Sequence, residues 1–278
     1  MNISTRTWGG ALLVLALVAV IVVAVTMTGG DSEAPPESAE PGSDVEQSAD
    51  DRESAGSAGS PDRGADLLGR PVAAVALPGG EPLPQSDGVG GFPEGGSGPV
   101  AAPAGLELQR VATGTTLMVS TGDGPAGREG DVMTEYAQTA QGAALLAANY
   151  VGLGMAFGDP YADFLERFAG RLADEDPAAV EEVRLLGGAD TRAEGLETSY
   201  LAPRWFKVSS CSPEFCTVEV AMPAPADAMG DIAPTDIDPN THVLFRLSLQ
   251  WAGEEWEILA MRDLPPVTDI DASWEQWI

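Results

Sequence analysis

Apolar residues recur at helical spacing in three consecutive stretches of the second half of the chain. The first stretch follows Thr139, a helix-capping residue, and runs to about Gly152. The second and third open at Asp159-Pro160 and Asp176-Pro177, where an aspartate cap precedes a first-turn proline. The apolar stripes are Ala143, Leu146, Ala147, Tyr150 and Val151, then Tyr161, Phe164, Leu165, Phe168 and Leu172, then Val180, Val183 and Leu186. We therefore predict three helices, and we expect the apolar stripe of the first helix to be buried.

The spacing then changes from helical to alternating, which indicates strands. Segments 205–211 and 216–222 flank a four-residue loop, and segments 245–251 and 256–262 flank a turn. Two shorter strands are also predicted before the helices, within 105–119. Helices followed by a four-stranded antiparallel meander are typical of an α+β domain, for which we predict the bounds 105–278.

Residues Trp8 to Thr28 form an apolar run without a charged side chain, long enough for a helix that crosses the hydrocarbon core. Arg6 precedes the run and acidic residues follow it, which favours a cytoplasmic N-terminus. We predict a retained single-pass anchor in the cell membrane, in which residues 1–28 form a cytoplasmic tip and a transmembrane helix. The rest of the chain then lies on the extracytoplasmic side. A cleaved signal peptide is the alternative, although such peptides have a shorter apolar region.

Residues 29–104 are dominated by Gly, Pro, Ser, Ala and acidic residues. Such a segment buries too little apolar surface to offset the entropy lost on ordering, so we predict a disordered tether. One apolar island, residues 67–77, interrupts the tether. It is either a part of the linker that associates nonspecifically through apolar side chains or a short docking segment.

The net charge narrows the classes of partner. The 278 residues include 43 Asp plus Glu against 14 Lys plus Arg, a formal charge of -29. This field repels the phosphates of nucleic acid, so nucleic-acid binding is disfavoured.

Cys211 and Cys216 are the only two cysteines and bracket the predicted hairpin loop. In an exported domain this arrangement predicts a structural disulfide, because a redox pair is more usually C-x-x-C and a zinc site needs further ligands.

No catalytic or cofactor-binding residue stands out, and we predict no cofactor and no metal. His242 is the only histidine, and its position at a strand start indicates a loop or edge-strand residue. An acidic stretch with Asp231, Asp236, Asp238 and Asn240 resembles the start of a calcium loop. Counted from Asp236, however, Thr241 and Leu247 stand where such a loop has glycine and glutamate, so we expect a solvated acidic loop.

Trp274 and Trp277 follow the last predicted strand. We expect them to pin the C-terminus onto the domain through their large buried area. If they are exposed instead, they form a partner-binding anchor.

Three motifs carry a family resemblance: Gly122-Asp123-Gly124-Pro125, the segment from Tyr136 to Ala143, and Ala147-Ala148-Asn149. They resemble uncharacterised actinobacterial membrane-anchored proteins with one span, a low-complexity tether and an exported domain, some of which accompany mobile genetic elements. The element order also resembles the cone-shaped domains of the nuclear transport factor 2-like superfamily. Neither resemblance implies catalytic residues.

These observations favour a non-enzymatic extracytoplasmic interaction module with a protein partner, as an accessory part of an envelope or conjugative DNA-transfer assembly. The alternative is a small-ligand-binding or enzymatic domain that uses the pocket of the cone. A deep pocket with converging polar groups would favour the alternative, and a pocket filled by apolar side chains would favour the module. A spacer with no specific ligand is a third hypothesis.

Overall fold

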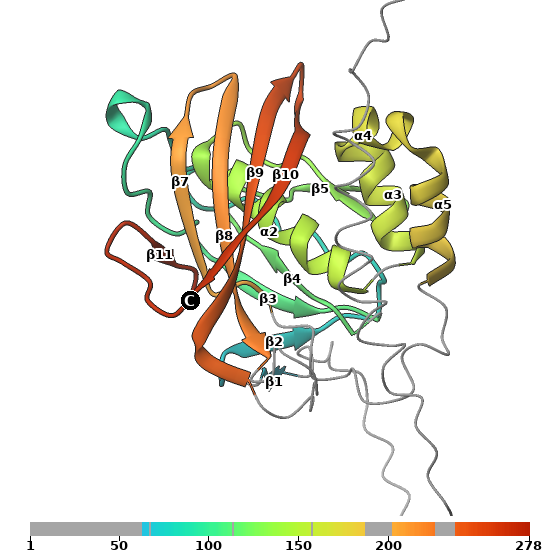
Figure 1. Ribbon diagram of the computed structural model, residues 1–278, viewed down its shortest axis with the longest axis horizontal. Helices are drawn as coiled ribbons and strands as arrows, with labels where there is room; N and C mark the ends of the chain where they lie inside the picture. Colours follow the sequence, from blue (N-terminus) through green and yellow to red (C-terminus); the bar gives the residue numbers. More distant parts are fainter. Residues whose placement is uncertain (1–62, 67, 113, 157, 187–201, 226–236) are drawn as a thin grey trace, which may run out of the picture.

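The computed structural model describes residues 63–278, except 67, 113, 157, 187–201 and 226–236. Within these residues the protein is an α+β domain in which a central helix lies between two sheets (Figure 1). The α+β class predicted from the sequence is therefore confirmed. The elements are β1 (Arg63–Ala65), β2 (Pro71–Ala74), η1 (Glu94–Gly96), β3 (Glu107–Arg110), β4 (Thr116–Val119), β5 (Gly127–Glu129), β6 (Val132–Thr134), α2 (Ala140–Ala156), α3 (Asp159–Phe168), α4 (Gly170–Glu175), α5 (Pro177–Leu186), β7 (Trp205–Cys211), β8 (Phe215–Pro225), β9 (Ile237–Ala252), β10 (Glu255–Val267) and β11 (Glu275–Gln276).

The larger sheet has the strand order β10-β9-β8-β7-β11, and every pair in it is antiparallel. Strands β7 to β10 are the predicted meander. The short strand β11 pairs with β7 and so covers the edge that the meander leaves open. An unpaired strand edge invites association with other chains, and β11 reduces that exposure.

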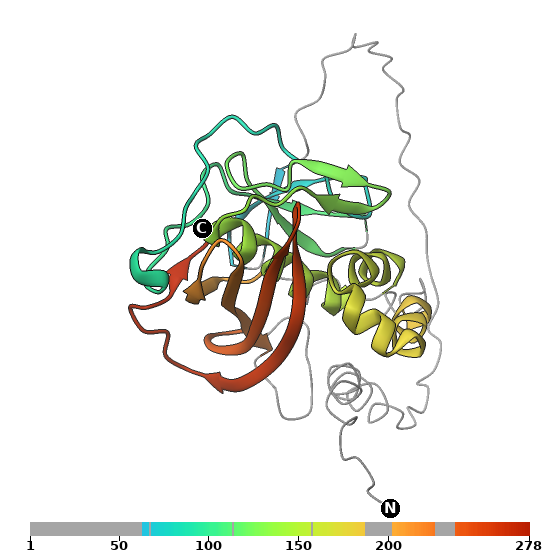
Figure 2. The same ribbon diagram turned by 90° about the horizontal axis from the view of Figure 1, so that it is seen from above.

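The face of α2 that the sequence predicts to be buried is buried, and the other faces of the helix are buried as well over residues 140–154. It contacts β4 of the smaller sheet on one side and β7, β8 and β9 of the larger sheet on the other. Viewed from above, the larger sheet curves around it (Figure 2). A helix that is apolar all round is expected in such a position, since no side of it faces water. Thr139 caps it as predicted, because its Oγ1 accepts a hydrogen bond of 2.9 Å from the Gly142 backbone N–H.

The second predicted helix is divided at Ala169 into α3 and α4, and α5 follows. The aspartate before α5 acts as predicted, since Asp176 Oδ1 accepts a hydrogen bond from the Ala179 N–H. Asp159 differs, because α3 begins at this residue and its cap is Gly158, at a φ of 85°. Together α3, α4 and α5 form a helical layer at the side of the sheets (Figure 1).

The ordered domain begins earlier in the chain than the sequence predicts. Strand β1 pairs with β2, and β2 pairs in parallel with β3, so residues 63–74 belong to the smaller sheet. Val72 and Val100 are 3% and 7% exposed and lie in the core. The prediction of a disordered tether is thus wrong for the described residues between 63 and 104. Residues 29–62 and the apolar run Trp8 to Thr28 lie outside the described residues, and no described helix is long and apolar enough to cross a membrane.

A buried ion pair fastens this early segment to the rest of the domain. The Arg70 guanidinium donates to Asp66 Oδ2 at 2.7 Å and to the carbonyls of Ala202 and Pro203 at 2.8 and 2.9 Å. Burial lowers the pKa of Arg70, and the adjacent Asp66 carboxylate opposes this effect. Arg70 therefore ties the β1–β2 turn to the chain just before β7.

Candidate functional site

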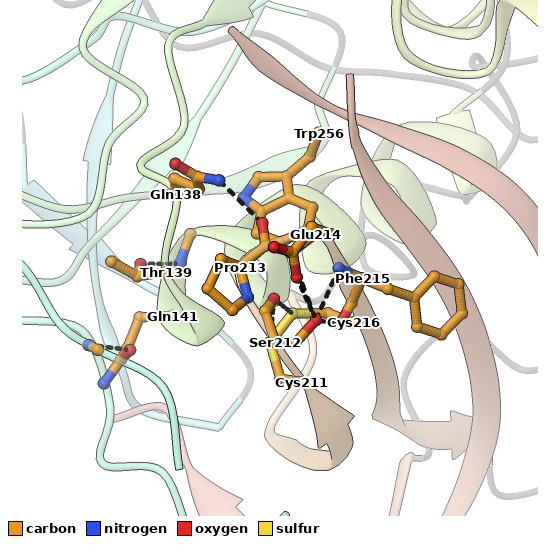
Figure 3. The surroundings of a disulfide bond; sticks show 12 residues. Gln138, Thr139, Gln141, Cys211, Ser212, Pro213, Glu214, Phe215, Cys216 and Trp256 are labelled. Atoms are coloured by element: carbon orange, nitrogen blue, oxygen red, sulfur yellow. Dashed lines mark hydrogen bonds between the residues drawn. A yellow bond between two sulfur atoms is a disulfide. The ribbon is translucent and has the colours of Figure 1, made fainter. Parts of the chain in front are cut away.

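The disulfide predicted from the sequence is present between Cys211 and Cys216. It joins the end of β7 to the start of β8 and encloses Ser212–Phe215, which we call the disulfide tip (Figure 3). Both cysteines are buried, whereas Phe215 is 40% exposed and points away from the disulfide. The structure thus places an exposed aromatic side chain on a covalently closed loop.

Hydrogen bonds hold the disulfide tip on two sides. Gln138 Nε2 donates to the Pro213 carbonyl at 2.8 Å, and the Trp251 backbone N–H donates to the Glu214 carbonyl at 2.9 Å. Beneath the tip, the indole N–H of the buried Trp256 donates to the Ala137 carbonyl at 2.8 Å. The tip is therefore fixed to the segment before α2 and to strand β9, which limits the conformational entropy that it loses on binding.

A glycine-rich loop lies against the start of α2, close to the tip. Asp123 Oδ1 accepts a hydrogen bond from the Gly90 N–H at 2.8 Å, and Gln141 Oε1 accepts one from the Gly91 N–H at 3.1 Å. A Cβ at Gly90 would lie 2.2 Å from the end of the Gln141 side chain, so a larger residue there would displace that side chain. Further along, Gly96 lies beside the Cys211 carbonyl.

The residues that carry the family resemblance have structural roles. Asp123, which is 1% exposed, also accepts a hydrogen bond of 2.8 Å from Thr139 Oγ1, so it links the Gly-Pro turn to the helix cap. Asn149 accepts from the Met118 N–H at 2.7 Å, and its Nδ2 donates to the Met118 carbonyl and the Tyr136 hydroxyl, both at 2.9 Å. Burial raises the pKa of Tyr136, and this hydrogen bond with Asn149 acts in the opposite direction. These hydrogen bonds lie within the fold, and among the described residues only Asp123 Oδ2 of this group has no hydrogen-bond partner.

The two C-terminal tryptophans have different environments. Trp277 is 3% exposed and stacks on Phe206, with ring centroids 4.1 Å apart, so it pins the C-terminus as expected. Trp274 is partly exposed, and the Lys207 ammonium lies 6.0 Å from its ring centroid. Of these two tryptophans, only Trp274 keeps a surface that a partner can reach without unfolding the C-terminus.

His242 is buried at 4% exposure, within β9 and between β8 and β10. The prediction of a loop or edge-strand histidine is therefore wrong, because β9 extends further toward the N-terminus than the alternating pattern indicates. Among the described residues, no group of three or more His, Cys, Asp or Glu could hold a metal ion. Asp231 and Asp236 of the acidic stretch lie outside the described residues.

A shallow hollow lies between the β5–β6 turn and α3 and is rich in acidic side chains. Its lining comprises Glu129, Gly130, Asp131, Val132, Asp163, Glu166 and Arg167. Arg167 forms ion pairs with Glu129 and Glu255, so part of the negative charge is compensated. No described group in it combines a nucleophile with a neighbouring base, as acyl-transfer chemistry requires.

The fold and these surfaces define an α+β domain with a disulfide-closed loop. The chain belongs to the family described as a domain of unknown function (DUF8175), which it matches over residues 71–275. This match begins at β2, in agreement with the early start of the ordered domain. No curated protein and no solved structure matches the chain.

Proposed function

We propose that this protein is a non-enzymatic interaction module, held outside the cell membrane by the apolar segment Trp8 to Thr28. Its protein partner belongs to the cell envelope, where the module serves as an accessory component of an envelope or conjugative DNA-transfer assembly. The formal charge of -29 makes nucleic acid an unfavourable ligand.

The observation that carries this proposal is the contrast between the filled interior and the disulfide tip. The concave face of the larger sheet is occupied by α2, and the largest fully buried side chains include Trp256, Phe164, Phe168 and Phe206. The tip instead leaves Phe215 40% exposed on a loop that a disulfide and hydrogen bonds hold in place. Rigid, exposed aromatic residues are frequent centres of protein–protein interfaces.

The alternative is a small-ligand-binding or enzymatic domain with a cone-like fold. It requires an open pocket on the concave side of the sheet, with polar groups that converge on a ligand. Helix α2 lies against β7, β8 and β9 on that side, and Val218, Leu247 and Leu249 of the sheet are each 0% exposed. The filled interior therefore favours the interaction module.

Site-specific photo-crosslinking in the cells that make the protein tests the proposal. A photoreactive amino acid replaces Phe215 in the full-length chain, and membranes are irradiated before the adducts are identified by mass spectrometry. The matched control carries the same amino acid at Leu185, which is 73% exposed and lies on α5, away from the tip. We expect one envelope protein to be captured from position 215 and not from position 185.

The substitution Phe215→Ala gives a second measurement. Truncating a central aromatic residue of an interface costs more than about 1 kcal/mol, so co-purification of the captured protein should fall at least about fivefold. Equal adducts from positions 215 and 185, or unchanged co-purification with Phe215→Ala, would contradict the proposal.

A further inference from the structure

Phe215 belongs to a row of side chains that crosses the outer face of the larger sheet. It lies opposite Gln250 of β9, and Gln250 lies opposite Glu257 of β10. The neighbouring row is fully buried and consists of Cys216, Leu249 and Ile258. Since side chains alternate between the two faces of a sheet and α2 occupies the inner face, the first row faces outward. We call Phe215, Gln250 and Glu257 the tip row.

Two carboxylates near the Phe215 ring lack a counter-charge. Glu257 is partly exposed and lies two strands away from Phe215, a separation of about 10 Å. Glu214 precedes Phe215 in the disulfide tip, is exposed, and accepts a hydrogen bond of 3.1 Å from the neutral Ser212 hydroxyl. Neither carboxylate forms an ion pair among the described residues. The tip row therefore combines an exposed aromatic ring with uncompensated negative charge.

The strands around the tip row supply no cation that balances this charge. Segments 209–217 and 249–257 contain no lysine or arginine, and their acidic residues are Glu214, Glu254, Glu255 and Glu257. Of these four, only Glu255 pairs with a cation in the described part of the chain, Arg167 of α3. Arg246 lies four residues from Gln250, about 13 Å along β9, and its guanidinium already donates to Glu219 at 2.6 and 2.9 Å. A cation for the tip row therefore has to come from another molecule.

Two other partly exposed aromatic rings of the domain are paired with cations of the same chain. The Arg204 guanidinium lies 5.5 Å from the ring centroid of Trp205, and the Lys207 ammonium lies 6.0 Å from that of Trp274. Such contacts are favourable, because the face of an aromatic ring carries partial negative charge. Phe215 makes no contact of this kind with a cation of the described residues. At 40% exposure, it therefore keeps a ring surface that can receive a cation from a partner (Figure 3).

We propose that the envelope partner binds the tip row through a cationic side chain, arginine or lysine, which stacks on the Phe215 ring and pairs with Glu257. This inference rests on the proposed function, because it specifies the chemistry of the partner at the same surface. Arginine suits the role best, since its planar guanidinium can stack on a ring and also donate to a carboxylate. The formal charge of -29 attracts such a partner and is screened by salt, so binding is strongest at low ionic strength.

Photo-crosslinking from position 250 tests the ring contact, because a photoreactive amino acid in place of Gln250 leaves Phe215 and both carboxylates intact. Membranes that hold the full-length chain are irradiated, and the yield of the adduct with the partner captured from position 215 is measured. Phe215→Leu keeps an apolar side chain but removes the ring, and Phe215→Trp supplies a ring that attracts cations more strongly. We expect the yield to fall about fivefold with Phe215→Leu and to stay equal or rise with Phe215→Trp.

Removal of one negative charge tests the ion pair in the same assay. Glu257→Gln should lower the yield about twofold to fivefold at low ionic strength. The wild-type yield should also fall in about 1 M salt, where the Debye length is about 3 Å. The matched control is Glu175→Gln, which changes the net charge equally at an exposed residue at the end of α4 and should leave the yield unchanged. Thermal unfolding of each variant checks that the domain is folded.

The outcomes separate this inference from the proposed function. If Phe215→Leu or Glu257→Gln captures as much partner as wild type while Phe215→Ala captures less, the interaction module stands and the cationic contact is wrong. Absence of any capture from positions 215 and 250 would overturn both. An adduct with lipid, with glycan or with a second copy of this chain in place of an envelope protein would overturn the choice of occupant.

Discussion

Replacing Arg70 with methionine tests whether the β1–β2 segment is an integral part of the fold. The substitution keeps much of the aliphatic length but removes the donors to Asp66, Ala202 and Pro203. Removing one partner of a buried ion pair costs about 3–5 kcal/mol, because the other charge stays buried and uncompensated. The Asp66 side chain is 1% exposed, but its Oδ1 still accepts from two backbone N–H groups, at 2.9 Å each. We therefore expect a loss near the lower limit, about 3 kcal/mol.

Urea unfolding followed by tryptophan fluorescence measures this loss in a fragment that begins at residue 63. The double variant Asp66→Asn with Arg70→Met should recover part of it, since no unpaired charge remains. A single variant within about 0.5 kcal/mol of wild type would refute the reasoning, because surface substitutions without a structural role have effects of that size. A double variant no more stable than the single one would show that the lost carbonyl contacts dominate.

Three further predictions follow from the fold. A fragment of residues 63–278 should unfold cooperatively in urea, whereas a fragment of residues 105–278, which lacks β1, β2 and the buried valines, should lose that transition. Asn149→Leu leaves the Met118 N–H and carbonyl without their side-chain partners and should lower the free energy of unfolding by about 2–4 kcal/mol in the same assay. Desolvation raises the pKa of Asp263 in the folded protein, so its ionisation destabilises the fold as pH rises through that pKa. Asp263→Asn should therefore be more stable than wild type at about pH 7 and equal to it in acid below the unfolded value of about 3.9, and equal stability at both pH values would contradict this.

The sequence predicts those elements whose apolar pattern is long and regular. The meander and the helix starts at Thr139 and Asp176 all follow from local periodicity and capping chemistry. The burial of α2 on every side does not follow, because its second face is made of small residues such as Ala144 and Ala148, which give little apolar signal. A helix that is packed closely on both sides needs such residues, so the tight packing itself weakens the pattern.

The early start of the domain depends on contacts that are distant in sequence. Residues 63–104 have the composition of a linker, and their order comes from pairing with β3 and from Arg70, which reaches the chain more than a hundred residues away. Composition averages over a segment and gives no information about such partners. A short apolar run with one arginine and one aspartate nearby was the only local signal, and it is equally compatible with sticky linker.

The motifs of the family resemblance also help to separate residues with structural roles from candidate binding residues. Thr139 and Asn149 bond to neighbouring backbone or side chains, and Asp123 Oδ1 accepts from Gly90 and Thr139, so the fold accounts for these contacts. Asp123 Oδ2 has no hydrogen-bond partner among the described residues. Residues that the fold does not explain are better candidates for binding. Phe215 is such a residue, because it exposes an aromatic ring on a rigid loop. This exposure costs the isolated domain free energy by leaving apolar surface in water, and a bound partner would relieve that cost.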